Sequence, residues 1–182
     1  VLGMAELSGD KMNMKDAEIL EVTTEGDIGE EDEPEGIGRV SDLEIPMTLR
    51  ECCEDVKDAF HLGAVKVFGN LEDKVKQAFG LPFVLAYGSN AVREPVSRIA
   101  VSPGAGGSMI RYALEQKAQV LITGDIGHHE GIDAVAQGLA IIDGGHYGIE
   151  HIFIEDMRQY LEKNLKDVEV IAAPIIHPFL LV

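Results

Sequence analysis

Residues 120–150, VLITGDIGHHEGIDAVAQGLAIIDGGHYGIE, contain two short apolar runs, at 120–123 and 140–143. Each run is followed by a glycine-containing turn and then by a segment of helical character, about 130–138 and 147–165. Short apolar strands that alternate with helices of ten or more residues are typical of βαβ units. The stretch therefore predicts an α/β fold with a mainly parallel sheet and helices on both faces.

The same alternation extends outward from this stretch. We expect a strand at 99–102 and a helix at 108–117 before it, and a final strand at 168–172 after it. Thr48 followed by Glu51 indicates a capped helix start. Strands are expected at 64–68 and at 17–22, and the partner of the strand at 17–22 is expected upstream of residue 1. The adjacent Cys52 and Cys53 have neither metal-ligand nor disulfide-framework spacing, so we interpret them as core residues in a reducing, cytoplasmic setting.

Charge divides the chain unevenly. The net charge is −17, and residues 1–36 contain twelve acidic and two basic side chains. We expect an acidic, partly mobile lead-in at 1–36, with a mobile loop at about 24–36, and an α/β domain at 37–182 with a short helix at 71–79. Such a charge disfavours nucleic-acid and anionic membrane partners, and no apolar run approaches the roughly 18 residues of a membrane span.

A glycine-rich turn at 104–108 lies where a strand is expected to lead into a helix. Backbone amides at Gly104, Gly106, Gly107 and Ser108 are suited to holding a phosphate or a carboxylate. Tight-turn packing remains the alternative, because the spacing matches neither a dinucleotide fingerprint nor a P-loop.

Two further loops follow expected strands and carry ionisable side chains. Asp125 and His129 lie just after the strand at 120–123, where ligands bind in parallel sheets. The alternatives are that Asp125 caps the next helix and that the histidine faces solvent. His146 and Glu150 have i, i+4 spacing, so a helix would place both on one face within reach of a metal ion. A histidine cap with a local hydrogen bond is the alternative for this pair.

Several motifs in register give the chain a family resemblance from about residue 36 to its end. They are GIGRV at 36–40, PMTL at 46–49, the glycine turn, ITGD at 122–125 and IDGGHY at 142–147 with Glu150. The chain resembles the Nif-three-like dinuclear metal centre proteins, often named GTP cyclohydrolase 1 type 2 homologues. Residues 71–92 look like extra sequence relative to compact members.

The resemblance implies a Nif-three-like α/β fold, ring-like homo-oligomers with a hexamer as one form, and a suspected hydrolytic activity. It implies two divalent metal ions per complete subunit, with zinc, iron and manganese as candidates. His146 and Glu150 match metal ligands, while His129 and Asp125 match groups beside the site that would face substrate or support the ligands. The remaining ligands, a His-His-Pro segment and an acid, are expected upstream of residue 1.

The leading hypothesis is a metal-dependent hydrolase that acts on a nucleotide or a related phosphate-bearing small molecule. His129 would move protons, because an unperturbed imidazole titrates near pH ~6.5. The alternative from another class is a non-catalytic metal-binding scaffold or regulatory interaction protein with closed coordination. A metal-free anion-binding module is a third reading.

Overall fold

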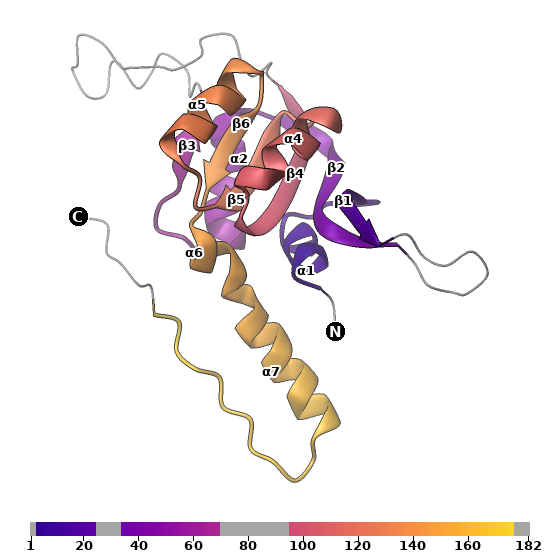
Figure 1. Ribbon diagram of the computed structural model, residues 1–182. Helices are drawn as coiled ribbons and strands as arrows, with labels where there is room; N and C mark the ends of the chain where they lie inside the picture. Colours follow the sequence, from indigo (N-terminus) through magenta and orange to yellow (C-terminus); the bar gives the residue numbers. More distant parts are fainter. Residues whose placement is uncertain (1–2, 25–33, 70–94, 177–182) are drawn as a thin grey trace.

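The computed structural model describes residues 3–24, 34–69 and 95–176 and centres on one six-stranded sheet (Figure 1). The strand order across the sheet is β1-β2-β4-β5-β6-β3. The strands are β1 (Glu18–Thr24), β2 (Glu35–Met47), β3 (Lys66–Phe68), β4 (Val96–Ala105), β5 (Val120–Gly124) and β6 (Ala140–Asp143).

The sheet is mixed, so the expectation of a mainly parallel sheet is wrong. Only the central trio is parallel, with β4 beside β5 and β5 beside β6. The three outer pairings, β1 with β2, β2 with β4 and β3 with β6, are antiparallel. The helix-linked strands are therefore parallel, as βαβ connections require, whereas β1, β2 and β3 join the sheet from the amino-terminal part of the chain.

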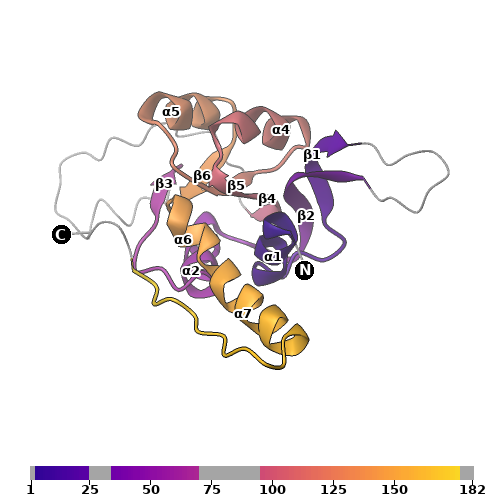
Figure 2. The same cartoon turned by 60° about the horizontal axis from the view of Figure 1, so that its bottom comes forward.

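Helices cover both faces of the sheet, as expected (Figure 2). One face packs against α1 (Met4–Lys11), α2 (Leu49–Ala59) and the first turns of α6 (His146–Glu150) and α7 (Ile152–Asn164). The other face packs against η1 (Gly107–Met109), α4 (Ile110–Glu115) and α5 (His128–Ala136). Successive β5 residues show the two-sided burial, because Ile122 belongs to the first core and Leu121 to the second.

Helix α2 begins as the sequence predicts. Thr48 Oγ1 accepts a hydrogen bond from Glu51 N, and Thr48 N donates to Glu51 Oε2 at 2.7 Å, which completes a capping box. Cys52 and Cys53 are buried on this helix, which confirms them as core residues. Burial raises the pKa of their thiols to about 12 and about 11, respectively, so both remain protonated near neutral pH.

The amino-terminal segment is part of the sheet-centred core. Leu7, Met12 and Leu20 are buried, and β1 pairs with β2. The expected domain boundary at residue 36 falls inside β2. Most of the expected acidic loop, together with the segment at 71–92, lies outside the described residues.

The long helix expected at 147–165 is divided into α6 and α7, and α7 projects away from the sheet (Figure 1). The strand expected at 168–172 is wrong, because residues 165–176 form neither helix nor strand. Val168 and Ile171 are exposed and pair with no neighbouring strand in the described chain. Among the described helices, none combines the length and apolar character that crossing a bilayer requires.

Candidate metal centre

The carboxyl ends of the parallel strands β4, β5 and β6 place three loops at one edge of the sheet. The loops after β5 and β6 are in direct backbone contact, since Gly144 N donates to Thr123 O at 2.9 Å. A Cβ on Gly124 would lie 2.5 Å from His146 N, so only glycine permits this approach. Backbone geometry therefore brings Asp125 close to His146.

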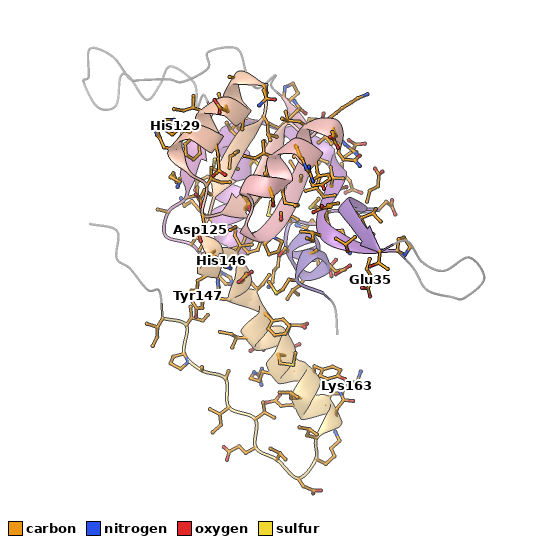
Figure 3. The ribbon with its side chains drawn as sticks, in the orientation of Figure 1. Glu35, Asp125, His129, His146, Tyr147 and Lys163 are labelled. Atoms are coloured by element: carbon orange, nitrogen blue, oxygen red, sulfur yellow. The ribbon has the colours of Figure 1, made fainter. Side chains whose placement is uncertain are left out.

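His146 lies between two carboxylates, those of Asp125 and Glu150, and Figure 3 shows Asp125 close to His146. Its Nδ1 is 3.2 Å from Asp125 Oδ2, and its Nε2 is 3.2 Å from Glu150 Oε2. The second contact comes from the i, i+4 spacing within α6, where one turn places the two side chains on the same face. The structure thus brings together three of the predicted site residues.

The arrangement sets one imidazole against two carboxylates. An ionised carboxylate only accepts hydrogen bonds, and the imidazole presents one ring nitrogen to each of them. The side chains of His146, Glu150 and Asp125 are 48%, 37% and 57% exposed, respectively, so the group faces solvent in this chain.

The donor set fits a divalent metal ion as a partial first shell. Two ligands of a tetrahedral zinc ion lie about 3.4 Å apart, close to the 3.2 Å between His146 Nε2 and Glu150 Oε2. Within residues 3–24, 34–69 and 95–176, however, no cluster of three or more His, Cys, Asp or Glu side chains is arranged to hold a metal. The described residues supply fewer ligands than such a site normally uses.

The glycine turn contributes one wall of this site. Gly104 has a φ of +82°, and a Cβ there would lie 3.1 Å from Glu150 Oε1 and 3.5 Å from His146 Nε2. Gly106 and Gly107 instead pack tightly, against Thr123 and Glu130, respectively. Ser108 is exposed within η1. The turn therefore opens at the same sheet edge as His146, while packing accounts for Gly106 and Gly107.

His129 lies apart from Asp125 and His146, on helix α5 (Figure 3). Its ring makes an edge contact with His128, with the ring centroids 5.4 Å apart. The catalytic role predicted for His129 stays a prediction.

Two residues that the sequence did not single out support the loops of this site. Asp143, at the end of β6, accepts hydrogen bonds from backbone amides of both loops. Lys66 of β3 forms an ion pair with it, with Nζ 2.7 Å from Oδ2. The position of Asp143 within IDGGHY, directly before the turn that leads into His146, could have indicated a role beside the site. Its pairing with Lys66 depends on the register of β3 and β6.

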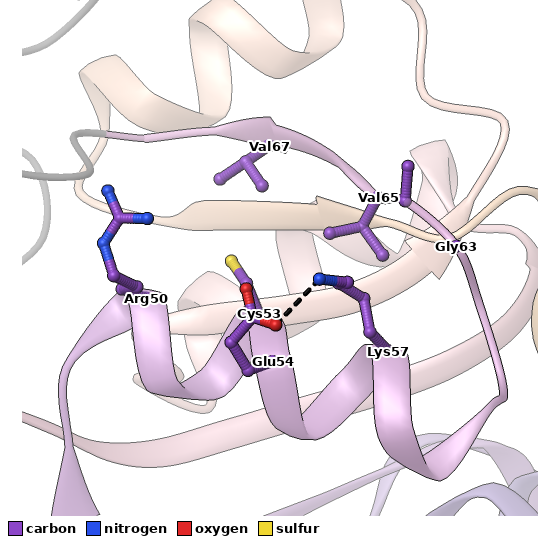
Figure 4. Close-up of a pocket in the computed structure, with 8 residues that line it drawn as sticks. Arg50, Cys53, Glu54, Lys57, Gly63, Val65 and Val67 are labelled. Carbon is purple, nitrogen blue, oxygen red and sulfur yellow. Dashed lines mark hydrogen bonds and ion pairs between the residues drawn. The ribbon is translucent and has the colours of Figure 1, made fainter. Parts of the chain in front are cut away.

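A separate cavity of about 240 Å³ lies between α2 and the segment that leads to β3 (Figure 4). Cys53, Val65 and Val67 give it apolar walls, and an ion pair of 2.7 Å between Lys57 Nζ and Glu54 Oε2 lies at its edge. The Cys53 thiol is protonated near neutral pH, so it does not give the cavity an activated nucleophile.

The fold and the carboxylate–histidine cluster define an α/β protein with a candidate metal centre at the carboxyl ends of parallel strands. The sequence pattern of the family described as Duf34/NIF3 (NGG1p interacting factor 3) matches residues 2–178. The chain therefore belongs to this family, which confirms the resemblance.

Curated relatives and solved structures agree with this assignment. A protein named GTP cyclohydrolase 1 type 2 homolog from Halalkalibacterium halodurans is 32% identical over 152 residues, covering 81% of this chain and 35% of that protein. One of the same name from Lactococcus lactis is 34% identical over 154 residues, covering 84% and 47%. The chain thus spans less than half the length of these two relatives.

The fold is shared with a Bacillus cereus protein related to NIF3. The two structures align with a TM-score of 0.74 at 18% identity, covering 99% of this chain and 70% of that one. A hypothetical protein from Staphylococcus aureus aligns with a TM-score of 0.72 at 21% identity, covering 99% and 64%.

Proposed function

We propose that this chain supplies His146 and Glu150 as ligands to a divalent metal centre of a hydrolase that acts on a nucleotide or a related phosphate-bearing small molecule. The observation that carries the proposal is the 3.2 Å separation of His146 Nε2 and Glu150 Oε2 at a solvent-accessible sheet edge. The names of the curated relatives support a GTP cyclohydrolase type of reaction.

Asp125 has a defined task in this proposal. Its carboxylate accepts the Nδ1 proton of His146, which fixes the ring orientation and leaves Nε2 as the ligand atom. Divalent ions bound there would lower the pKa of a bound water and stabilise negative charge that develops on the substrate. Gly104 lies beside His146 Nε2 and Glu150. Because glycine has no side chain, a substrate or water can approach these two ligand groups.

Two protein donors fall short of the usual three or four, so the remaining ligands have to come from other residues. We propose two ions per complete site and a homo-oligomeric, ring-like assembly, as the family resemblance implies. The 182-residue chain is then expected to bind metal weakly and to hydrolyse little.

Metal titration of this chain tests the ligand assignment. We expect zinc and manganese to bind the unmodified chain, and His146→Ala and Glu150→Gln to weaken binding by about tenfold or more. His128→Ala is the matched control, because it removes an imidazole of helix α5 that we do not assign as a ligand. Equal affinity of the His146→Ala variant and the unmodified chain would contradict the proposal.

An open or a closed coordination position on the metal distinguishes a hydrolase from the non-catalytic scaffold. An open catalytic position predicts that the visible spectrum of the cobalt-loaded protein changes on addition of inorganic phosphate or GTP. A spectrum that is unchanged by both, in a protein that binds cobalt tightly, favours the non-catalytic scaffold.

A further inference from the structure

Asp143 is a buried carboxylate at the junction of two loops. The residue is 5% exposed at the end of β6. Its Oδ1 accepts from Gly145 N at 2.9 Å and from Asp125 N at 3.2 Å, and its Oδ2 accepts from Ile126 N at 3.0 Å. One side chain therefore fixes backbone in the loop that carries Asp125 and in the turn that leads into His146.

Lys66 completes this arrangement from the neighbouring strand. Lys66 and Asp143 are paired in the antiparallel register of β3 and β6, and Lys66 Nζ is 2.7 Å from Asp143 Oδ2. The same ammonium group donates to Ile126 O at 3.0 Å. Lys66 thus neutralises the buried carboxylate and holds the same loop from its other side.

The loop that carries Asp125 adopts an unfavourable backbone conformation at that residue. Asp125 has a φ of +55°, which is uncommon for a residue with a side chain, whereas the φ of +77° at Gly145 is one that glycine adopts readily. The conformation of Asp125 persists where surrounding contacts impose it. The amides of both residues donate to Asp143, so this carboxylate stabilises the backbone that aims Asp125 and His146 at each other.

We propose that Asp143 and Lys66 are positioning residues for the candidate metal centre, where they hold Asp125 and His146 in register so that His146 presents Nε2 beside Glu150. The proposal rests on the proposed function for its metal-binding consequence. Its geometric part concerns the orientation of the His146 ring, which is measurable without metal.

General stability is the competing explanation. The Lys66 side chain is 55% exposed, so its ion pair with the buried Asp143 is partly solvated and contributes only modest net stability. The Asp143 carboxylate also accepts hydrogen bonds from three backbone amides in the two loops that carry the site. This distribution of contacts fits loop positioning better than simple core stabilisation.

The experiment compares four variants of the 182-residue chain. Asp143→Asn removes the charge, Lys66→Met removes the ion pair, and Lys66→Arg keeps a cation at the same place. Val56→Ala creates a cavity in the core on α2 and serves as the stability-matched control. The readouts are the His146 imidazole nitrogen shifts, hydrogen exchange of the Asp125, Ile126 and Gly145 amides, and cobalt affinity, with His146→Gln used to assign the imidazole signals.

We expect Asp143→Asn and Lys66→Met to move the His146 signals, to speed exchange of these amides by about tenfold and to weaken cobalt binding by about tenfold. Lys66→Arg and Val56→Ala should leave these readouts near those of the unmodified chain. The proposal is overturned if Asp143→Asn and Lys66→Met match Val56→Ala in imidazole shifts and amide exchange. If Asp143→Asn does not fold, Lys66→Met decides by the same readouts.

A failure of the proposed function is distinguishable from a failure of this inference. An unmodified chain that binds no cobalt contradicts the metal-centre proposal. The imidazole shifts and amide exchange of the variants still decide whether Asp143 and Lys66 orient His146.

Discussion

Single residues at the candidate site differ in how far the sequence could reveal them. The i, i+4 spacing of His146 and Glu150 was sufficient to predict their proximity, because a helix imposes it locally. The contact between His146 and Asp125 depends on the close approach of two loops at Gly124. The ion pair between Lys66 and Asp143 depends on the register of β3 and β6. Neither depends on local sequence alone, so spacing could not reveal them.

Gly104 is a residue at which a methyl group should disturb the side chains of the site directly. Gly104→Ala places a Cβ 3.1 Å from Glu150 Oε1 and puts alanine at a φ of +82°. We expect a loss of about 1 kcal/mol or more in the free energy of unfolding and weaker zinc binding, measured by urea unfolding and by titration.

Gly63→Ala is the control for Gly104→Ala. A Cβ on Gly63 meets no other atom within 4 Å, so we expect neither a comparable loss of stability nor weaker zinc binding. Equal zinc affinity of the Gly104→Ala and Gly63→Ala variants would show that Gly104 does not border the ligand site.

Elements were predicted best where their signals were local. The capping box of α2 and the strands β5 and β6 follow directly from residue type and spacing. Strand β2 was not predicted, and its antiparallel pairing with β4 joins segments about fifty residues apart in the sequence. The strand expected at 168–172 has apolar residues but no adjacent strand to pair with in the described chain, which local pattern cannot reveal.

The start of α2 offers a test of local capping. Thr48→Ala removes the acceptor for Glu51 N, so we expect a loss of about 1 kcal/mol in the free energy of unfolding, with Thr48→Ser close to the unmodified chain. Thermal or urea unfolding followed by circular dichroism measures both. A loss of equal size in Thr48→Ser would contradict the capping explanation, because serine keeps the hydroxyl.

The same cap sets a pH dependence. Hydrogen bonds from the backbone amide and then the hydroxyl of Thr48 lower the pKa of Glu51 below its ordinary value of 4.5. A lowered pKa in the folded state means that the carboxylate contributes stability above about pH 4.5, and that this contribution is lost as the pH falls through the folded-state pKa. Glu51→Gln should therefore reduce the acid-induced loss of stability.

At the scale of the whole molecule, the candidate centre joins segments that are far apart in sequence. Gly104 lies near the end of β4, Asp125 follows β5, and His146 and Glu150 lie on α6. The unfolded chain does not hold these groups together, so a metal ion that binds them favours the folded state of the entire sheet. Local ligand geometry thereby becomes coupled to global stability.

This coupling predicts a metal-dependent unfolding temperature. A free zinc concentration of 100 times Kd should stabilise the chain by about 2.7 kcal/mol, and each tenfold increase beyond that should add about 1.4 kcal/mol. His146→Ala should unfold at a temperature that zinc barely changes, whereas His128→Ala should respond like the unmodified chain. Calorimetry at two zinc concentrations measures this, and an equal rise in the His146→Ala variant would place the stabilising ion elsewhere, because ions bound outside the His146–Glu150 pair do not depend on that imidazole.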